Sequence, residues 1–135
     1  MTKLDRTELL TEARQLLKNS KTLDRRGQII YTISENTLSY IANIINVLPI
    51  NAPRPTLHPL SDDGMGLYWG FFGLNQRKSL TFNLYGTGRL ITVMVQNSDV
   101  KIDSRYFDKL AHEIKKIFKD WNLQTFLDQD NTCRP

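Results

Sequence analysis

The chain has 135 residues, with 18 Lys and Arg against 14 Asp and Glu, for a formal net charge of +4. This length is typical of one domain. Such a chain buries about two-thirds of its unfolded surface, so it needs no disulfide or bound metal in order to fold. The basic excess is too small to indicate nucleic-acid binding by itself. The single cysteine, Cys133, cannot form an internal disulfide, which favours a reducing, cytoplasmic setting.

No targeting or membrane segment is expected. The N-terminus, MTKLDRTELLTEARQ, carries a charge every few residues and lacks the apolar core of a signal peptide. No apolar run approaches the ~20 residues that a membrane span needs.

Two early stretches have the apolar spacing of amphipathic helices. In residues 5–19, Asp5 is the expected N-cap, and the leucine-rich face of the helix is expected to be buried. The second helix begins at Ser34 and ends before Pro49, because a residue before proline avoids helical angles. Its apolar arc is wide, which predicts burial on most sides.

A proline-rich connector and a set of strands follow. The connector runs into a short edge strand at Thr56–His58. Residues 65–71, 80–85 and 90–95 then predict an antiparallel meander, and the last is expected at its centre because it is apolar on both faces. Alternation places four side chains of the first of these strands in the core: Met65, Leu67, Trp69 and Phe71.

The last element expected is a C-terminal helix, with Asp103 or Ser104 as its cap and an apolar stripe from Phe107 to Trp121. The predicted fold class is therefore α+β: two N-terminal helices, an antiparallel three- to four-stranded meander, and a C-terminal helix packed on one sheet face. Residues 1–130 are expected to form one domain, and 131–135 a frayed tail.

The sequence offers no catalytic or metal-binding constellation, and no cofactor is expected. His112-Glu113 begins like the zinc-protease motif H-E-x-x-H, but Lys116 stands where the second histidine is required. Adjacent Asp62 and Asp63 precede a glycine, which is typical of turn formers rather than of an acid–base pair. The chain is therefore expected not to be an enzyme.

Two surfaces remain as candidates. One is a partner-binding surface, either the second face of the sheet or the Arg77-Lys78 loop, since Tyr and Trp are enriched in partner surfaces. Alternatively, the N-terminal helix or the proline-rich connector covers that face. The candidate partner-binding residues are Tyr68, Phe72, Arg77, Lys78 and Tyr85.

The other candidate is a basic patch for nucleic acid, which requires the fold to gather residues that are distant in sequence. Its members are Arg25, Arg26, Lys115, Lys116 and Lys119, with Arg77 and Lys78 able to contribute. Acidic residues lie between the lysines of the C-terminal helix, which is typical of a solvated face. Nucleic-acid binding is therefore the second hypothesis, after binding of a protein partner.

Three segments resemble a broad family of small uncharacterised bacterial proteins: TISENTLSYIANIINVLP, PRPTLHPLSDDGMGLYW and LTFNLYGTGRLITV. The shared pattern is P-x-I-x-P, a D-G turn and a strand ending in Trp. It covers roughly residues 32–96 and is carried by Pro55, Pro59, Gly64, Leu67 and Trp69. The sequence departs from the family at Tyr68, where an acid is usual, and in LDRRGQIIYTI, which replaces a Trp-rich segment.

The family's genes are scattered over plasmids, phages and genomic islands, so the resemblance implies an inhibitor, immunity protein or antitoxin. The first hypothesis is therefore a non-enzymatic protein that binds another protein, for example a bacterial defence or toxin enzyme. A nucleic-acid-associated protein is the alternative, and a homodimer is left open.

Overall fold

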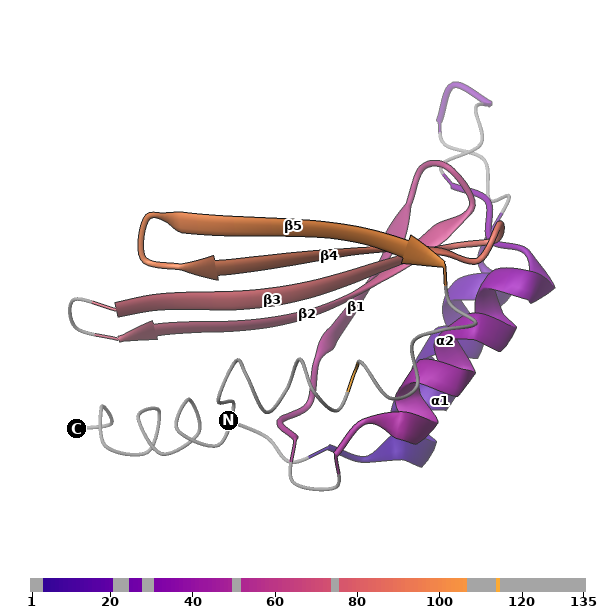
Figure 1. Ribbon diagram of the computed structural model, residues 1–135. Coiled ribbons are helices and arrows are strands. Elements are labelled where there is room, and N and C mark those ends of the chain that lie inside the picture. Colours follow the sequence, from indigo (N-terminus) through magenta and orange to yellow (C-terminus); the bar gives the residue numbers. More distant parts are fainter. Residues whose placement is uncertain are drawn as a thin grey trace.

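The computed structural model describes residues 4–20, 25–27, 31–49, 52–73, 76–106 and 114, with the backbone alone for residues 71–73 and 76 (Figure 1). Two helices, α1 (Arg6–Lys18) and α2 (Glu35–Val47), precede five strands. The strands are β1 (Thr56–Leu60), β2 (Gly64–Gly73), β3 (Gln76–Tyr85), β4 (Arg89–Gln96) and β5 (Asp99–Tyr106). They form one antiparallel sheet in the order β1-β2-β3-β4-β5.

The predicted fold class was wrong in its sheet and in its last element. The sheet has five strands rather than three or four, because residues 99–106 continue the meander as β5. Asp103 and Ser104 lie inside this strand and cap no helix. Within the described residues no C-terminal helix packs on the sheet. Of residues 107–121, which were predicted as the apolar stripe of that helix, the structure describes Ile114 alone. Its side chain is fully buried.

Both N-terminal helices begin at the predicted caps. Asp5 accepts a hydrogen bond from the Glu8 N–H, and Ser34 accepts one from the Thr37 N–H, which satisfies a free donor in each first turn. Hydrogen bonds also join the first residue of α1 to the C-terminal end of α2. The Arg6 guanidinium donates to the carbonyls of Ile45 and Leu48, at 3.2 and 2.5 Å, in the last turn of α2.

One face of the sheet, here called the inner face, packs on the helices. Alternation along β2 turns Met65, Leu67 and Trp69 toward α2, and all three are buried. The Trp69 ring packs edge-on against Phe82 of β3, with centroids 5.7 Å apart. Its indole N–H also donates to the Pro53 carbonyl at 2.7 Å, which fixes the connector against the sheet.

The helices cover one end of the sheet only. α2 contacts β2 and β3, and α1 contacts α2 and β1. The β2–β3 and β4–β5 ribbons extend away from both helices, so the end of β2, the start of β3 and the β4–β5 turn lie far from the helices (Figure 1). The expected central strand, β4, lies fourth in the order and pairs with β5 at the edge.

The turn between β1 and β2 connects the sheet to the start of α2. The Asp63 carboxylate accepts from the Ser34 N–H at 2.6 Å and from the Thr37 hydroxyl at 2.8 Å. The Asp63 carbonyl accepts from the Gly86 N–H at 3.0 Å. Asp63 has a φ of 54°, in the left-handed region that Asp tolerates in turns. This residue therefore joins three elements.

Candidate partner-binding face

The second face of the sheet, here called the outer face, is formed by the strand residues that alternate with the core residues. Strand pairing identifies them, since Tyr68 lies opposite Thr81, Thr81 opposite Val93, and Val93 opposite Ile102. Neither α1 nor α2 packs there. In the described part of the chain, the side chains that β4 and β5 place on this face are half-buried or exposed, and none of them is fully buried.

The β1–β3 part of the outer face is flat because rings lie over glycines. A Cβ on Gly66 would stand 2.3 Å from the His58 imidazole, and one on Gly70 would stand 2.4 Å from the Tyr68 hydroxyl. Tyr85 covers Gly64 in the same way, at 2.8 Å. A Cβ at any of these glycines would therefore force the side chain above it to move.

An apolar strip follows on β4 and β5. Val100 and Ile102 are 57% and 70% exposed, and Tyr106 beyond them is 64% exposed. Their β4 neighbours are half-buried, and together they form the apolar strip: Ile91, Val93, Val95, Val100 and Ile102. Contiguous exposed apolar side chains on a sheet face are typical of a surface that another molecule covers.

The outer face carries charge of one sign. Arg77 and Arg89 are the charged residues that the described strands place there, and both are exposed. Arg89 donates to the Ser104 hydroxyl at 2.9 Å, which holds its guanidinium over the face. All strand carboxylates of the described residues, Asp99 and Asp103 of β5, lie on the inner side. The face is thus apolar with a basic rim.

The structure brings only part of the predicted partner-binding set together. Tyr68, Arg77 and Tyr85 share the outer face, but Arg77 and Tyr85 lie at opposite ends of β3, about 27 Å apart at ~3.4 Å per residue. Lys78 was expected in a loop with Arg77, but both lie in β3, and Lys78, which follows Arg77, belongs to the inner side. The backbone of Phe72 pairs with Arg77, and its side chain lies outside the described atoms.

Sequence reasoning missed the exposed large hydrophobic residues of this face, Val100, Ile102 and Tyr106. It ended the last strand at residue 95 and capped a helix at Asp103 or Ser104, which left no strand for them. A signal was present, since Val100 and Ile102 alternate with charged residues at the period of a strand.

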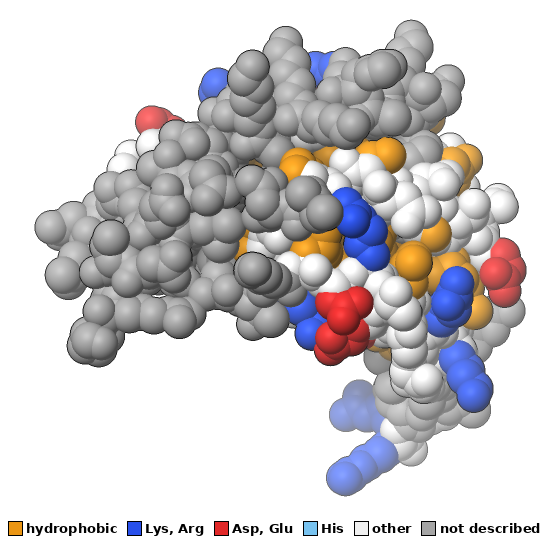
Figure 2. Space-filling model, turned by 90° about the horizontal axis from the view of Figure 1, so that it is seen from below, with side chains coloured by type: hydrophobic (Ala, Val, Ile, Leu, Met, Phe, Trp, Pro, Cys, Tyr) orange, Lys and Arg blue, Asp and Glu red, His pale blue; other side chains and the backbone are white. Residues whose placement is uncertain are grey.

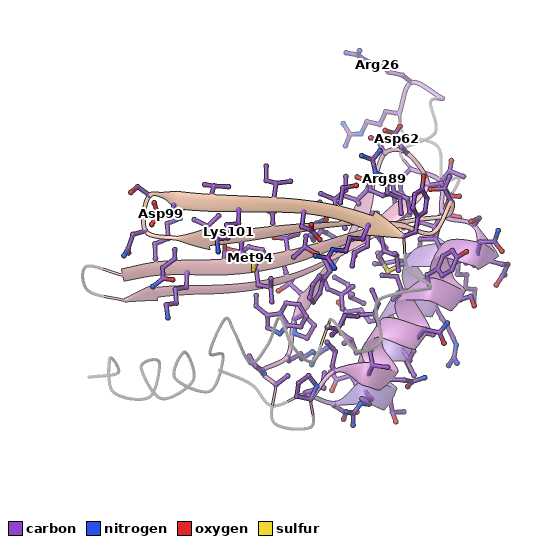
Figure 3. All side chains as sticks on the ribbon, viewed as in Figure 1. Arg26, Asp62, Arg89, Met94, Asp99 and Lys101 are labelled. Atoms are coloured by element: carbon purple, nitrogen blue, oxygen red, sulfur yellow. The ribbon has the colours of Figure 1, made fainter. Side chains whose placement is uncertain are left out.

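The described basic residues do not gather into one patch. Arg25 and Arg26 belong to the segment 25–27, which lies at the end of the molecule where the helices are, and Figure 3 labels Arg26 there. Arg77 is the second residue of β3, which starts at the end of the sheet away from the helices (Figure 1). On the face in Figure 2, the described Lys and Arg side chains stand apart, with acidic side chains among them. Lys115, Lys116 and Lys119 lie outside the described residues.

In the adjacent acidic pair, Asp62 and Asp63, the carboxylate of Asp63 has a structural role. Asp62 is exposed, while the Asp63 carboxylate is hydrogen-bonded at the start of α2. Among the residues that the structure describes, no three His, Cys, Asp or Glu side chains cluster as metal ligands. In the same residues, no helix has the length and hydropathy that a membrane crossing requires.

Burial of His58 against β2 lowers its pKa, because desolvation penalises the imidazolium. The folded protein therefore binds this proton less tightly than the unfolded chain, whose value is near 6.5. Stability should fall as the pH drops through that value. We expect urea unfolding at pH 7.5 and 5.5 to show this loss, and the His58→Gln variant to show a smaller one. An equal loss in both proteins would exclude His58 as its source.

Comparison of the chain with protein-family models, with curated proteins and with solved structures found no match.

Proposed function

We propose that this chain is a small non-enzymatic protein that binds another protein through the outer face. The observation that carries the proposal is the apolar strip, because two of its members, Val100 and Ile102, are exposed on the outer face. Exposed aliphatic side chains in one patch favour a protein partner over a small ligand. The action is inhibition by occlusion, as by an immunity protein, an antitoxin or an inhibitor of a defence enzyme.

The charge of the face defines the partner's chemistry. Arg77 and Arg89 flank the apolar strip, and the described strands place no carboxylate on the same side. A partner surface with an apolar centre and an acidic rim complements this arrangement, and such complementarity favours association and specificity. The single Cys133 fits a cytoplasmic setting for this interaction.

The variant Val93→Glu tests the proposal, because it places a carboxylate in the middle of the apolar strip. We expect a protein captured from a bacterial lysate by the immobilised wild-type chain to be lost with this variant. Once that protein is purified, calorimetry should show affinity weakened about tenfold or more, as burying an unpaired charge costs over ~1.4 kcal/mol. Circular dichroism should show that the variant is folded.

Arg14→Glu is the control, since Arg14 is exposed on α1. It should bind the purified partner as the wild type does. Equal binding by the Val93→Glu variant would contradict the proposal, as would capture of no protein. A gel shift with duplex DNA and with RNA at low salt decides the nucleic-acid alternative, since an affinity that falls steeply with salt would identify that mode instead.

A further inference from the structure

β5 is an edge strand whose outer side is unpaired in the described part of the chain. The opposite edge, β1, contains Pro59, which lacks a donor and hinders further pairing. β5 has eight residues and contains no proline or glycine. An extended edge of this kind presents a row of backbone donors and acceptors that another strand can pair with.

The charges of β5 alternate in sign along its inner side. They are Asp99, Lys101, Asp103 and Arg105. β4 places uncharged residues opposite all of them: Gln96, Met94, Thr92 and Leu90. Arg105 donates to Asp103 at 2.6 Å within the strand, on the exposed surface. A run of one charge would repel a second copy, whereas alternating charges attract it when the order is reversed.

Antiparallel pairing of β5 with β5 of a second copy reverses the order in the required way. When Ile102 lies opposite Ile102, Asp99 lies opposite Arg105 and Lys101 lies opposite Asp103. Each of these pairs occurs twice because of the two-fold symmetry. Every charged pair across the junction is then of opposite sign, which stabilises cross-strand neighbours.

The backbone permits this register. The β4–β5 hairpin has a two-residue loop closed by Gln96 and Asp99, so these two residues form a hydrogen-bonded pair. Alternation then turns the backbone N–H and C=O of Val100, Ile102 and Ser104 toward the free edge. In the register centred on Ile102, these residues of one copy pair with the same three residues of the other.

Neighbouring registers are disfavoured by charge. A shift of one step in one direction places Lys101 opposite itself and Asp99 opposite Asp103. A shift in the other direction places Asp103 opposite itself and Lys101 opposite Arg105. Both shifts bring like charges together, which destabilises cross-strand pairs. Among the registers that keep opposite charges together, the one centred on Ile102 forms the largest number of such pairs between the described β5 residues.

We propose that two copies of this protein join through their β5 edges, with Ile102 on the two-fold axis, into one continuous antiparallel sheet. The outer faces of the two copies then form one surface, with Val100 of each copy beside Ser104 of the other. The proposal goes beyond the function proposed above, since it concerns the edge of β5 and not the occupant of the outer face.

Two charge reversals test the pairing. Lys101→Glu and Asp103→Lys each place like charges across the junction, so each variant alone should dimerise about tenfold more weakly or worse in sedimentation equilibrium over a concentration series. An equimolar mixture of the two should form a heterodimer, because Glu and Lys then face each other. The double variant Lys101→Glu with Asp103→Lys should dimerise like the wild type.

Arg14→Glu, which makes the same change in net charge as Lys101→Glu, should leave dimerisation unchanged, as should Val93→Glu. The last expectation separates this proposal from the outer-face proposal, which Val93→Glu is designed to disrupt. A wild-type chain that stays monomeric at all concentrations would overturn the β5 junction. Single reversals that dimerise normally, or a mixture that fails to recover the dimer, would overturn it equally.

Discussion

Replacing Trp69 by alanine is expected to lower the free energy of unfolding by about 3–5 kcal/mol, the range for removing a buried large aromatic side chain. Trp69 is 2% exposed and belongs to the buried core on the inner face of the sheet. The substitution leaves a cavity beside Phe82, whose edge-on contact with the indole is lost. It also leaves the Pro53 carbonyl without its donor. Since small domains are stable by only about 5–15 kcal/mol, the loss is a large part of the total.

The variant Trp69→Phe separates packing from hydrogen bonding. It retains an aromatic ring against Phe82 but cannot donate to Pro53, so we expect a loss of about 1–3 kcal/mol from the unsatisfied carbonyl and the smaller ring. Urea denaturation followed by circular dichroism measures both variants. A loss below ~1 kcal/mol for Trp69→Ala would show that this indole is not a main support of the core, contrary to its burial.

The parts of the fold that depend on local pattern were predictable. Asp5 and Ser34 were identified as helix caps because a short polar side chain before an apolar stripe has a specific backbone donor to bind. Met65, Leu67 and Trp69 were assigned to the core because a strand alternates with period two, and all three are buried. These inferences need no knowledge of distant residues.

β5 could not be recognised in the same way. Its apolar alternation is limited to Val100 and Ile102, and its residues are exposed apart from the half-buried Asp103. Asp103 and Ser104 are also favourable helix caps before an apolar run that begins at Phe107, and this local preference favoured a helix. Pairing with β4 decided the outcome, and such pairing depends on a partner strand rather than on intrinsic propensity.

The candidate face was predictable in its location but not in its centre. Tyr68 and Tyr85 were expected on the second side of the sheet and are there, but each lies over a glycine of β2. Only the geometry of the strands shows that a tyrosine covers its own sheet instead of extending to solvent. The exposed apolar strip lies on the strands where the sequence pattern was ambiguous, β4 and β5.

Asp63 should show a large effect for a residue in a surface turn. The variant Asp63→Ala is expected to lower the free energy of unfolding by about 2–3 kcal/mol, since it removes an acceptor from a buried helix start and forces alanine into the left-handed region. Thr37 is fully buried, so its hydroxyl loses the carboxylate at 2.8 Å and keeps the Asp63 carbonyl at 3.1 Å as an acceptor. The Ser34 N–H loses its acceptor as well.

Matched variants identify the cause of this loss. Asp62→Ala changes the adjacent, exposed carboxylate and should alter stability by no more than ~0.5 kcal/mol. Asp63→Asn keeps an acceptor oxygen and tolerates positive φ, so its loss should be smaller than that of alanine. Asp63→Gly relieves the backbone but provides no acceptor. If the glycine variant were as stable as the wild type, the hydrogen bonds of the Asp63 carboxylate to Ser34 and Thr37 would contribute no net stability.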